Sequence, residues 1–175
     1  LNFFFELIIV FLLILKSAGW VLAIFPESFV RVACAILGDL LYIFARRRRT
    51  TMLRNLHHAY PEKPLAWHRK IARESCRRLI EMGTFALASP WFNEKRARKI
   101  LTIPEPSLMI LNEIKASMPS GVGFIPHFTL TESLIMLSVI FPGLPPRSAI
   151  FRPLGNKTLD EWIKKTRERY GFKLF

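Results

Sequence analysis

The first 25 residues constrain this chain most, because they form a nearly continuous apolar run. From Leu1 to Phe25 only Glu6 and Lys16 carry a charge, and Trp20 lies near one end. About twenty consecutive apolar residues are enough for an α-helix to cross a bilayer. The run contains no small-x-small cleavage site, which argues against a cleaved signal peptide. We therefore predict a retained transmembrane helix over residues 1–25, with a signal peptide or an interfacial hairpin as the alternatives.

A second apolar stretch follows and leads into a block of arginines. A helix is expected from Phe29 to Ala45, in which only Arg31 and Asp39 are charged, and it ends in Arg46–Arg49. The stretch is too short and too interrupted for a second span, so residues 26–49 are predicted to form an interfacial or core helix with a basic end. Such a block is typical of the cytoplasmic side of a membrane and of contact with anionic headgroups. It serves equally well as an orientation signal without a ligand.

The charge of the chain narrows its possible partners. The 175 residues are 51% hydrophobic and carry a formal net charge of +13, with the positive charges following the apolar N-terminus. An excess of Lys and Arg suits anionic lipid, nucleic acid or an acidic protein. The sequence contains no recognisable nucleic-acid-binding motif, so the pattern favours a protein of the membrane surface. Cys34 and Cys76 have no second thiol or histidine at zinc-ligand spacing, so neither a disulfide framework nor a metal site is predicted.

A basic helix is expected from Leu65 to Ala88. Within it Arg69, Arg73 and Arg77 recur every four residues, and therefore lie on one face. Like charges at this spacing repel one another by roughly 0.2–0.5 kcal/mol per pair. We expect either that an anionic group lies opposite these arginines or that they form a basic face directed to solvent or to a membrane.

The second half of the chain alternates between strands and helices. After a helix over 108–116, the pattern predicts a strand over 121–125, a helix over 129–141, a strand over 148–151, a polar helix over 159–170 and a third strand from Phe172. This order indicates a parallel α/β domain over residues 50–175. In such sheets ligands gather at the carboxyl ends of the strands, where His127 and Arg152 fall.

His127 and Glu132 form a candidate catalytic pair at the end of the first expected strand. On one continuous helix a five-residue offset turns through about 140°, so the two side chains would point apart. They meet if His127 lies in the connection before the helix, a position that Pro126 favours. A carboxylate bonded to one imidazole nitrogen leaves the other free as a general base for a hydroxyl. A capping histidine beside a solvated glutamate is the simpler alternative.

Three further blocks accompany this His-x4-Glu pair. They are Asn55-Leu-His-His-Ala-Tyr-Pro-Glu62 upstream, and Phe151-Arg-Pro-Leu-Gly-Asn156 and Arg167-Glu-Arg-Tyr-Gly171 downstream. In this order the blocks resemble those of the lysophospholipid acyltransferase superfamily, and more narrowly those of the lauroyl/myristoyl acyltransferases of bacterial lipid A biosynthesis. His57 and His58 of the upstream block are structural in that family. One departure is Pro126, since many relatives have glycine before the histidine.

The resemblance implies a fold of the α/β class, with an N-terminal transmembrane helix followed by a glycerol-3-phosphate-acyltransferase-like α/β domain. The family's domain extends well beyond the last residue of this chain, Phe175, and the first residue, Leu1, is not methionine. We therefore expect residues 50–175 to be the N-terminal portion of that domain, with its C-terminal part missing.

The resemblance also implies a reaction, namely transfer of a fatty acyl chain to a hydroxyl of an anionic lipid A precursor. The donor would be acyl carrier protein or, less often, coenzyme A, and no metal or other cofactor is expected. His127 would act as the general base and Glu132 would orient it. The enzyme would work at the cytoplasmic face of the bacterial inner membrane.

Arg152, Asn156 and Arg167 are the candidate substrate-binding residues. Arg152 matches an arginine of the family, and a guanidinium can grip the phosphate of either substrate at two points. Asn156 falls at the family's usual interval. It either contacts substrate or only shapes the turn. Arg167 fits the family pattern, although the dipole of the helix also explains a basic run near a helix C-terminus.

Two other functions stay open. An acyltransferase of the same superfamily could use another glycolipid or a lysolipid as acceptor. Alternatively, a non-enzymatic, membrane-anchored basic protein could bind anionic lipid, in which case the arginines would matter and His127 would not.

Overall fold

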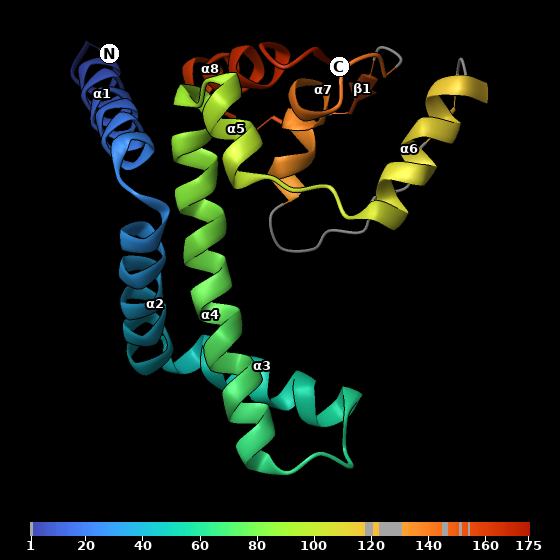
Figure 1. The fold of residues 1–175 in the computed structure, drawn as a ribbon. Helices are drawn as coiled ribbons and strands as arrows, with labels where there is room; N and C mark the ends of the chain where they lie inside the picture. Colours follow the sequence, from blue (N-terminus) through green and yellow to red (C-terminus); the bar gives the residue numbers. More distant parts are fainter. Residues whose placement is uncertain (1, 118–120, 123–130, 145–146, 151, 154) are drawn as a thin grey trace.

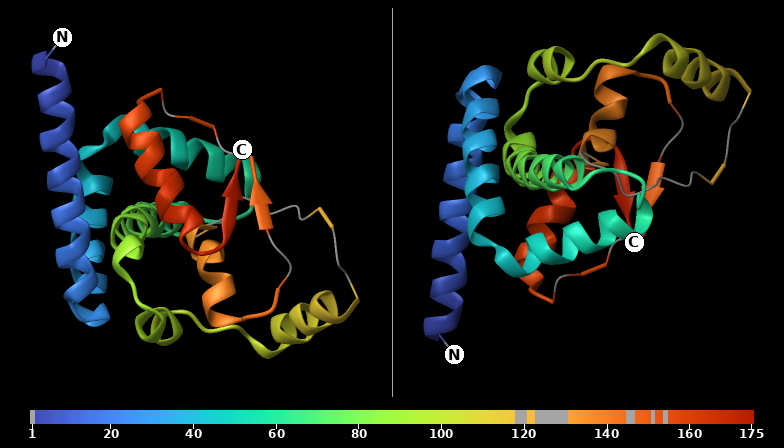
Figure 2. Two further views of the ribbon diagram at one scale, coloured as in Figure 1. Left: turned by 90° about the horizontal axis from the view of Figure 1, so that it is seen from above. Right: turned by 90° about the horizontal axis from the view of Figure 1, so that it is seen from below.

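The described part of the chain is mostly helical and is arranged around one long helix (Figure 1). The computed structural model describes residues 2–117, 121–122, 131–144, 147–150, 152–153 and 155–175. The central helix, α4 (Leu65–Ala88), begins and ends where the sequence predicts. The helices α1 (Asn2–Ile24) and α2 (Glu27–Phe44) lie on one side of it, and the two strands lie on the other (Figure 2).

Helix α1 is long and apolar enough to cross a membrane. Its segment Glu6–Ile24 has a mean hydropathy of 2.5, and only 11% of the segment is buried against the rest of the described chain. That low burial is unlike a core helix, although an N-terminal signal sequence would share these properties. The expected apolar N-terminal helix is therefore confirmed, and its crossing of a membrane stays a prediction.

Helix α2 ends earlier than expected, and the arginine block belongs to the next helix. Ala45 turns the chain, and α3 (Arg46–Ala59) leaves at 91° to α2. Arg49 reaches back and donates from Nη1 to the carbonyl oxygens of Tyr42 at 3.0 Å and of Ile43 at 3.1 Å. Because these bonds satisfy carbonyls at the end of α2, the helix can stop there. The prediction that the arginines end the second helix is wrong: they form the first turn of α3.

The block from Asn55 to Glu62 forms the end of α3 and the turn that leads into α4. His68, which the sequence did not single out, is buried, and its Nε2 lies 2.9 Å from the Tyr60 carbonyl oxygen. The rings of Tyr60 and Trp67 meet edge to face at 5.3 Å. His57 and His58 are exposed. These contacts agree with a structural role for this block.

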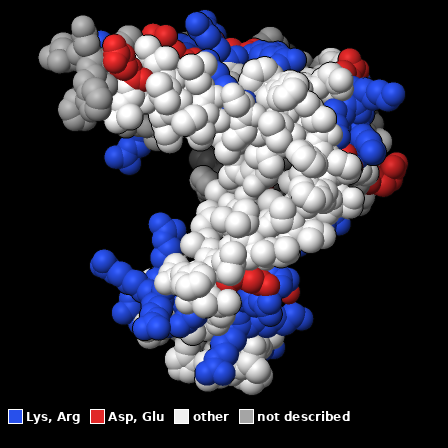
Figure 3. Space-filling model, turned by 90° about the vertical axis from the view of Figure 1, so that its left-hand side faces the viewer, with Lys and Arg blue, Asp and Glu red and all other residues white. Residues whose placement is uncertain are grey.

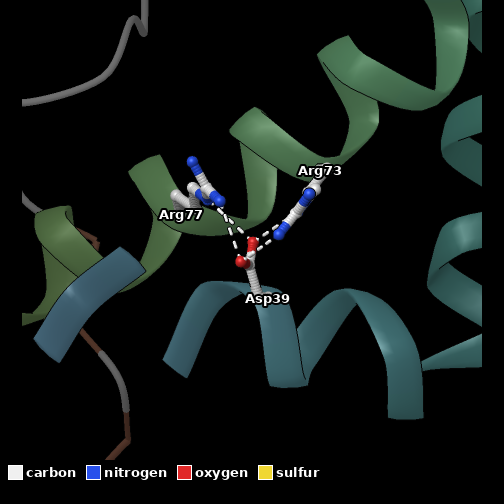
Figure 4. A network of polar contacts seen from close by, with 3 residues as sticks. All are labelled: Asp39, Arg73 and Arg77. Carbon is white, nitrogen blue, oxygen red and sulfur yellow. Dashed lines mark hydrogen bonds and ion pairs between the residues drawn. The ribbon is translucent and has the colours of Figure 1, made fainter. Parts of the chain in front are cut away.

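Helices α2 and α4 are joined through the carboxylate of Asp39 (Figure 4). The guanidinium groups of Arg73 and Arg77 each bind both of its oxygens, with 2.7 Å between each Nε and Oδ1. Hydrogen bonds from Arg77 and then Arg73 hold the pKa of Asp39 well below its usual range. The basic face of α4 thus meets an anionic group at two of its three arginines, while Arg69 is exposed.

Shorter elements build the second half. They are η1 (Ser89–Trp91), α5 (Glu94–Ile100), α6 (Glu105–Ser117), η2 (Thr131–Met136), α7 (Leu137–Ile140), β1 (Arg147–Ala149), α8 (Lys157–Glu168) and β2 (Phe172–Leu174). Strands β1 and β2 are parallel, with Arg147 opposite Phe172 and Ala149 opposite Leu174. Helix α8 makes the crossover that parallel strands require.

The α/β prediction is only partly supported. The two later strands and the helix between them are present, but the described sheet has two strands. The first expected strand, 121–125, lies largely outside the described residues, and its first two residues are not in a strand. The expected helix over 129–141 appears as the 3₁₀ segment η2 followed by α7, which is shorter than predicted. The described fold is therefore helical with a small parallel sheet.

Replacing Gly38 by alanine should destabilise the protein, because a Cβ there would lie 2.4 Å from the Cα of Arg77. Overpacking of this kind costs about 1–3 kcal/mol. Gly83→Ala is the matched control in α4, where a Cβ meets no atom within 4 Å. It should leave stability unchanged or raise it by about 0.5–1 kcal/mol. Circular dichroism during unfolding in detergent would measure the stability of both variants. Equal changes in stability would contradict this close α2–α4 contact.

Asp39→Asn should lower the melting temperature at neutral pH, and the deficit should shrink in acid. The folded-state pKa of Asp39 is lowered, so its stabilisation is complete above the ordinary carboxyl pKa of about 3.9 and is lost as pH falls through the folded-state value. Melting curves from neutral pH downward would show the two proteins converging below about pH 4. Glu94→Gln removes an exposed pair with Arg98 and should change little at any pH. If the melting temperature of Asp39→Asn is lower than that of the wild type by the same amount at every pH, the result would argue against the ion pair.

Candidate functional site

The structure describes the two predicted catalytic residues to different extents. His127 lies outside the described residues. Glu132 is the second residue of η2, and its side chain is outside the described part as well. Their contact therefore stays a prediction, and the structure describes only the surroundings of η2, the helix that carries Glu132.

Helix η2 is fixed to the end of α4 by Met136. This side chain is 1% exposed and belongs to a core cluster with Ala88, Phe92, Ala97 and Tyr170. Met136 follows Glu132 by four residues, so the backbone that carries the carboxylate is held against this core. The cluster packs α4, α5, η2 and the segment after α8 together next to the candidate site.

Tyr170 contributes a polar group, its phenol hydroxyl, to this core cluster. Its hydroxyl donates to the Ser89 carbonyl oxygen at 2.5 Å and lies 3.4 Å from that of Phe92. Its own carbonyl oxygen accepts a hydrogen bond from the Ser138 hydroxyl, and the neighbouring Arg169 donates to the Pro90 carbonyl oxygen. Burial raises the pKa of the Tyr170 phenol. Sequence reasoning missed this role, although the block Arg167–Gly171 was the signal for it.

Arg167 and η2 share a small pocket. The pocket has a volume of about 150 Å³ and is lined by Leu87 of α4, Ile135 and Met136 of η2, and Trp162 and Arg167 of α8. Arg167 is half-buried there. The structure thus brings one predicted substrate-binding residue to the helix that carries Glu132. The wall of this pocket is mostly apolar, and Arg167 is among its polar lining residues.

Strand β1 is tied to the same helix through Arg147. Its guanidinium lies 4.6 Å from the centre of the Phe172 ring and donates to the Leu134 carbonyl oxygen at 3.5 Å. Burial lowers the pKa of Arg147. The sequence analysis did not select Arg147, although it stands directly before the expected strand. Its contacts hold the edge of the sheet against η2.

Arg152 and Asn156 follow β1 in the connection to α8. Arg152 is exposed, and in the described part of this region it makes no ion pair or hydrogen bond. The side chain of Asn156 accepts a hydrogen bond from the Leu159 backbone N–H at 3.1 Å, which makes it the N-cap of α8. That contact matches the turn-shaping role considered for Asn156. Of these two residues, Arg152 carries a charge, and that charge has no partner among the described residues around it.

Metal-binding side chains do not cluster in the residues that the structure describes. No group of three or more His, Cys, Asp or Glu is placed there to hold an ion. Cys34 and Cys76 are buried free thiols. Burial raises the pKa of Cys76, so its thiol is less reactive than an exposed one.

Tyr170→Phe should lower the free energy of unfolding by about 1 kcal/mol, because it removes the hydrogen bond that the buried phenol hydroxyl donates to the Ser89 carbonyl oxygen. Tyr60→Phe is the matched control, since the Tyr60 ring is exposed and packs on Trp67 without a described hydroxyl bond. Denaturant unfolding monitored by circular dichroism would compare the two variants. A loss in Tyr60→Phe as large as that in Tyr170→Phe would contradict this role of the Tyr170 hydroxyl.

Comparison with known families provides evidence independent of this geometry. The family model for bacterial lipid A biosynthesis acyltransferases matches residues 5–175, which include the apolar helix and all four sequence blocks. Comparisons with curated proteins and with solved structures returned no match.

Proposed function

The chain belongs to the bacterial lipid A biosynthesis acyltransferase family, and from this we propose that it moves a fatty acyl chain from acyl carrier protein to a hydroxyl of a lipid A precursor. The single observation that carries the proposal is the family match over nearly the whole chain. Coenzyme A is the alternative donor. The pocket between Arg167 and η2 supports the proposal, because it is next to the backbone that carries Glu132.

In the proposed mechanism His127 takes the proton of the acceptor hydroxyl as its oxygen attacks the thioester carbon. Glu132 orients the imidazole and stabilises the imidazolium without itself taking the proton. The C–O bond of the new ester forms, the C–S bond breaks, and the leaving thiolate recovers the proton from the imidazolium. Because a thiol is a good leaving group, the reaction needs no stronger acid.

Negative charge that develops on the thioester oxygen needs hydrogen-bond donors. The first turn of a helical segment has backbone N–H groups without partners inside the helix, and η2 begins close after His127 in the sequence. We propose that these groups face the oxyanion. Direct attack is favoured over an acyl-enzyme, since no Gly-x-Ser-x-Gly motif surrounds Ser133.

Arg152 is the proposed phosphate contact. Its exposure, and the absence of an ion pair or hydrogen bond to it in the described residues around it, support this role. A guanidinium binds phosphate at two points, and both the lipid A precursor and the phosphopantetheine of the donor carry one. Arg167 would contact substrate from the pocket beside η2. Asn156 would act indirectly, because it caps the helix that follows Arg152.

The apolar α1 supports attachment to the bacterial inner membrane. We propose that the arginines of α3 keep the catalytic part on the cytoplasmic face, where positive charge is retained. The net charge of +13 suits both proposed partners, the anionic lipid A precursor and the acidic acyl carrier protein.

The proposal is tested with the full-length protein, radiolabelled lipid A precursor and acyl carrier protein donors. His127→Ala should reduce transfer by about 10²–10⁴-fold, the usual contribution of a general base, and Glu132→Ala should come close to it. His58→Ala is the matched control, because this histidine is exposed on α3 and far from η2 in sequence. Products resolved by chromatography would name the acceptor.

Unchanged transfer by a folded His127→Ala variant would rule out the mechanism. Transfer to a lysolipid or another glycolipid, but not to lipid A precursors, would replace the acceptor and keep the chemistry. If no acceptor is acylated by the wild type, and the protein still binds anionic lipid, the non-enzymatic function would be favoured.

A further inference from the structure

A second pocket lies beside the middle of α4, where α2, α3 and α4 meet. Its volume of about 450 Å³ falls within the roughly 300–1,000 Å³ of small-molecule sites. Leu41, Met52, Cys76 and Leu79 supply an apolar wall, and the exposed Arg47 and Arg48 contribute positive charge to the lining. We name this region the elbow pocket, and none of the residues in the proposed acyl transfer belongs to it.

The arginines beside the elbow pocket have no acidic partner among the described residues. Helix α3 contains five arginines and no Asp or Glu. In the described chain no carboxylate pairs with Arg46, Arg47 or Arg48, and Asp39 on the adjacent helix is already bound by Arg73 and Arg77. The arginine block also occupies the positive end of the α3 dipole, which adds to the repulsion. An anion at this position would relieve both effects.

An apolar surface leads to this cationic region. On its outward side α2 exposes Ile36, Leu40 and Ile43, and at its end Phe44 is 77% exposed. The side of the molecule formed by α1 and α2 is largely uncharged, and Lys and Arg gather at its lower end, where α3 lies (Figure 3). Apolar side chains that can contact hydrocarbon therefore lie next to arginines that can contact an anion.

We propose that the elbow pocket binds an anionic phospholipid, with the lipid phosphate on Arg47 and Arg48 and one acyl chain against Leu41, Met52 and Leu79. An acidic protein or free phosphate would use the arginines alone and leave the apolar pocket and Phe44 uncovered. A phospholipid uses both, and basic residues beside a membrane segment attract anionic headgroups. The 91° bend between α2 and α3 brings the apolar side chains of α2 and the arginines of α3 together at this pocket.

The test uses the full chain in neutral detergent micelles and measures retention of spin-labelled phosphatidylglycerol, with labelled phosphatidylcholine as the uncharged reference. Arg47→Gln with Arg48→Gln should weaken phosphatidylglycerol binding by roughly 10- to 30-fold and leave phosphatidylcholine unchanged. Lys95→Gln with Lys157→Gln removes the same charge from exposed sites on α5 and α8 and should have little effect. Circular dichroism melting would establish that each variant is folded.

A second variant tests the pocket itself. Ser75 is exposed and lines the elbow pocket, so Ser75→Phe should fill the space and weaken phosphatidylglycerol binding without changing the charge. Excess inorganic phosphate should displace the lipid only weakly from the wild type, because phosphate lacks the acyl contact.

Three results would overturn the proposal. One is equal loss of lipid in the arginine and lysine variants. Another is full displacement by inorganic phosphate with no effect of Ser75→Phe, which would indicate a simple anion site. The third is loss of acyl carrier protein binding in the arginine variant with unchanged lipid retention, which would indicate a protein-docking surface. Transfer activity is not a readout here, so failure of this proposal is distinguishable from failure of the proposed function.

Discussion

The position of the first three helices depends on the contact between Asp39 and two arginines of α4. Arg73 and Arg77 come from consecutive turns and bind the same carboxylate, while Gly38 lets the helix backbones approach closely. Arg73 is about half exposed, so solvent screening limits what its pair with Asp39 adds to stability. The effect of the two pairs is on register: only one alignment of α2 on α4 satisfies this carboxylate. Because α2 is joined to α1 and α3 by short turns, the same contact also positions those helices.

Helix α4 connects two chemically different regions of the molecule. At its C-terminal end, Met136 and Tyr170 hold η2, α8 and the small sheet around the proposed catalytic region. Beside its middle lies the elbow pocket, with an apolar wall and with arginines that have no acidic partner among the described residues. The α4 residues of that pocket, from Ser75 to Leu79, precede Ala88 by 9 to 13 positions, so the two regions are roughly 14–20 Å apart along the helix. Helix α4 thus sets the spacing between the proposed catalytic region and the elbow pocket.

Whether the contacts of a residue could be predicted from the sequence depends on how far along the chain its partners are. Three arginines on one face of α4 were evident from their spacing, but the spacing did not reveal that Asp39, more than thirty positions earlier, binds two of them. The block Arg167–Gly171 was recognised as a pattern, whereas the hydrogen bond from Tyr170 to Ser89 spans 81 positions. Asn156 is the contrasting case, since its capping contact is three residues away and local turn chemistry anticipated it. The His127–Glu132 contact stays a prediction.

By itself the sequence determined the apolar N-terminal helix, the limits of α4, the helix between two parallel strands, and the four blocks that indicated the family. These features depend on hydrophobic periodicity, helix-breaking residues and motif spacing, which are local along the chain. Tertiary structure alone decided that the arginine block opens a new helix at 91° and that Tyr170 joins the core cluster next to the proposed site. It also decided that Arg73 and Arg77 pair with Asp39, while Arg47 and Arg48 pair with no carboxylate among the described residues. Each of these depends on which distant carboxylate or carbonyl oxygen a side chain meets, and no local pattern contains that information.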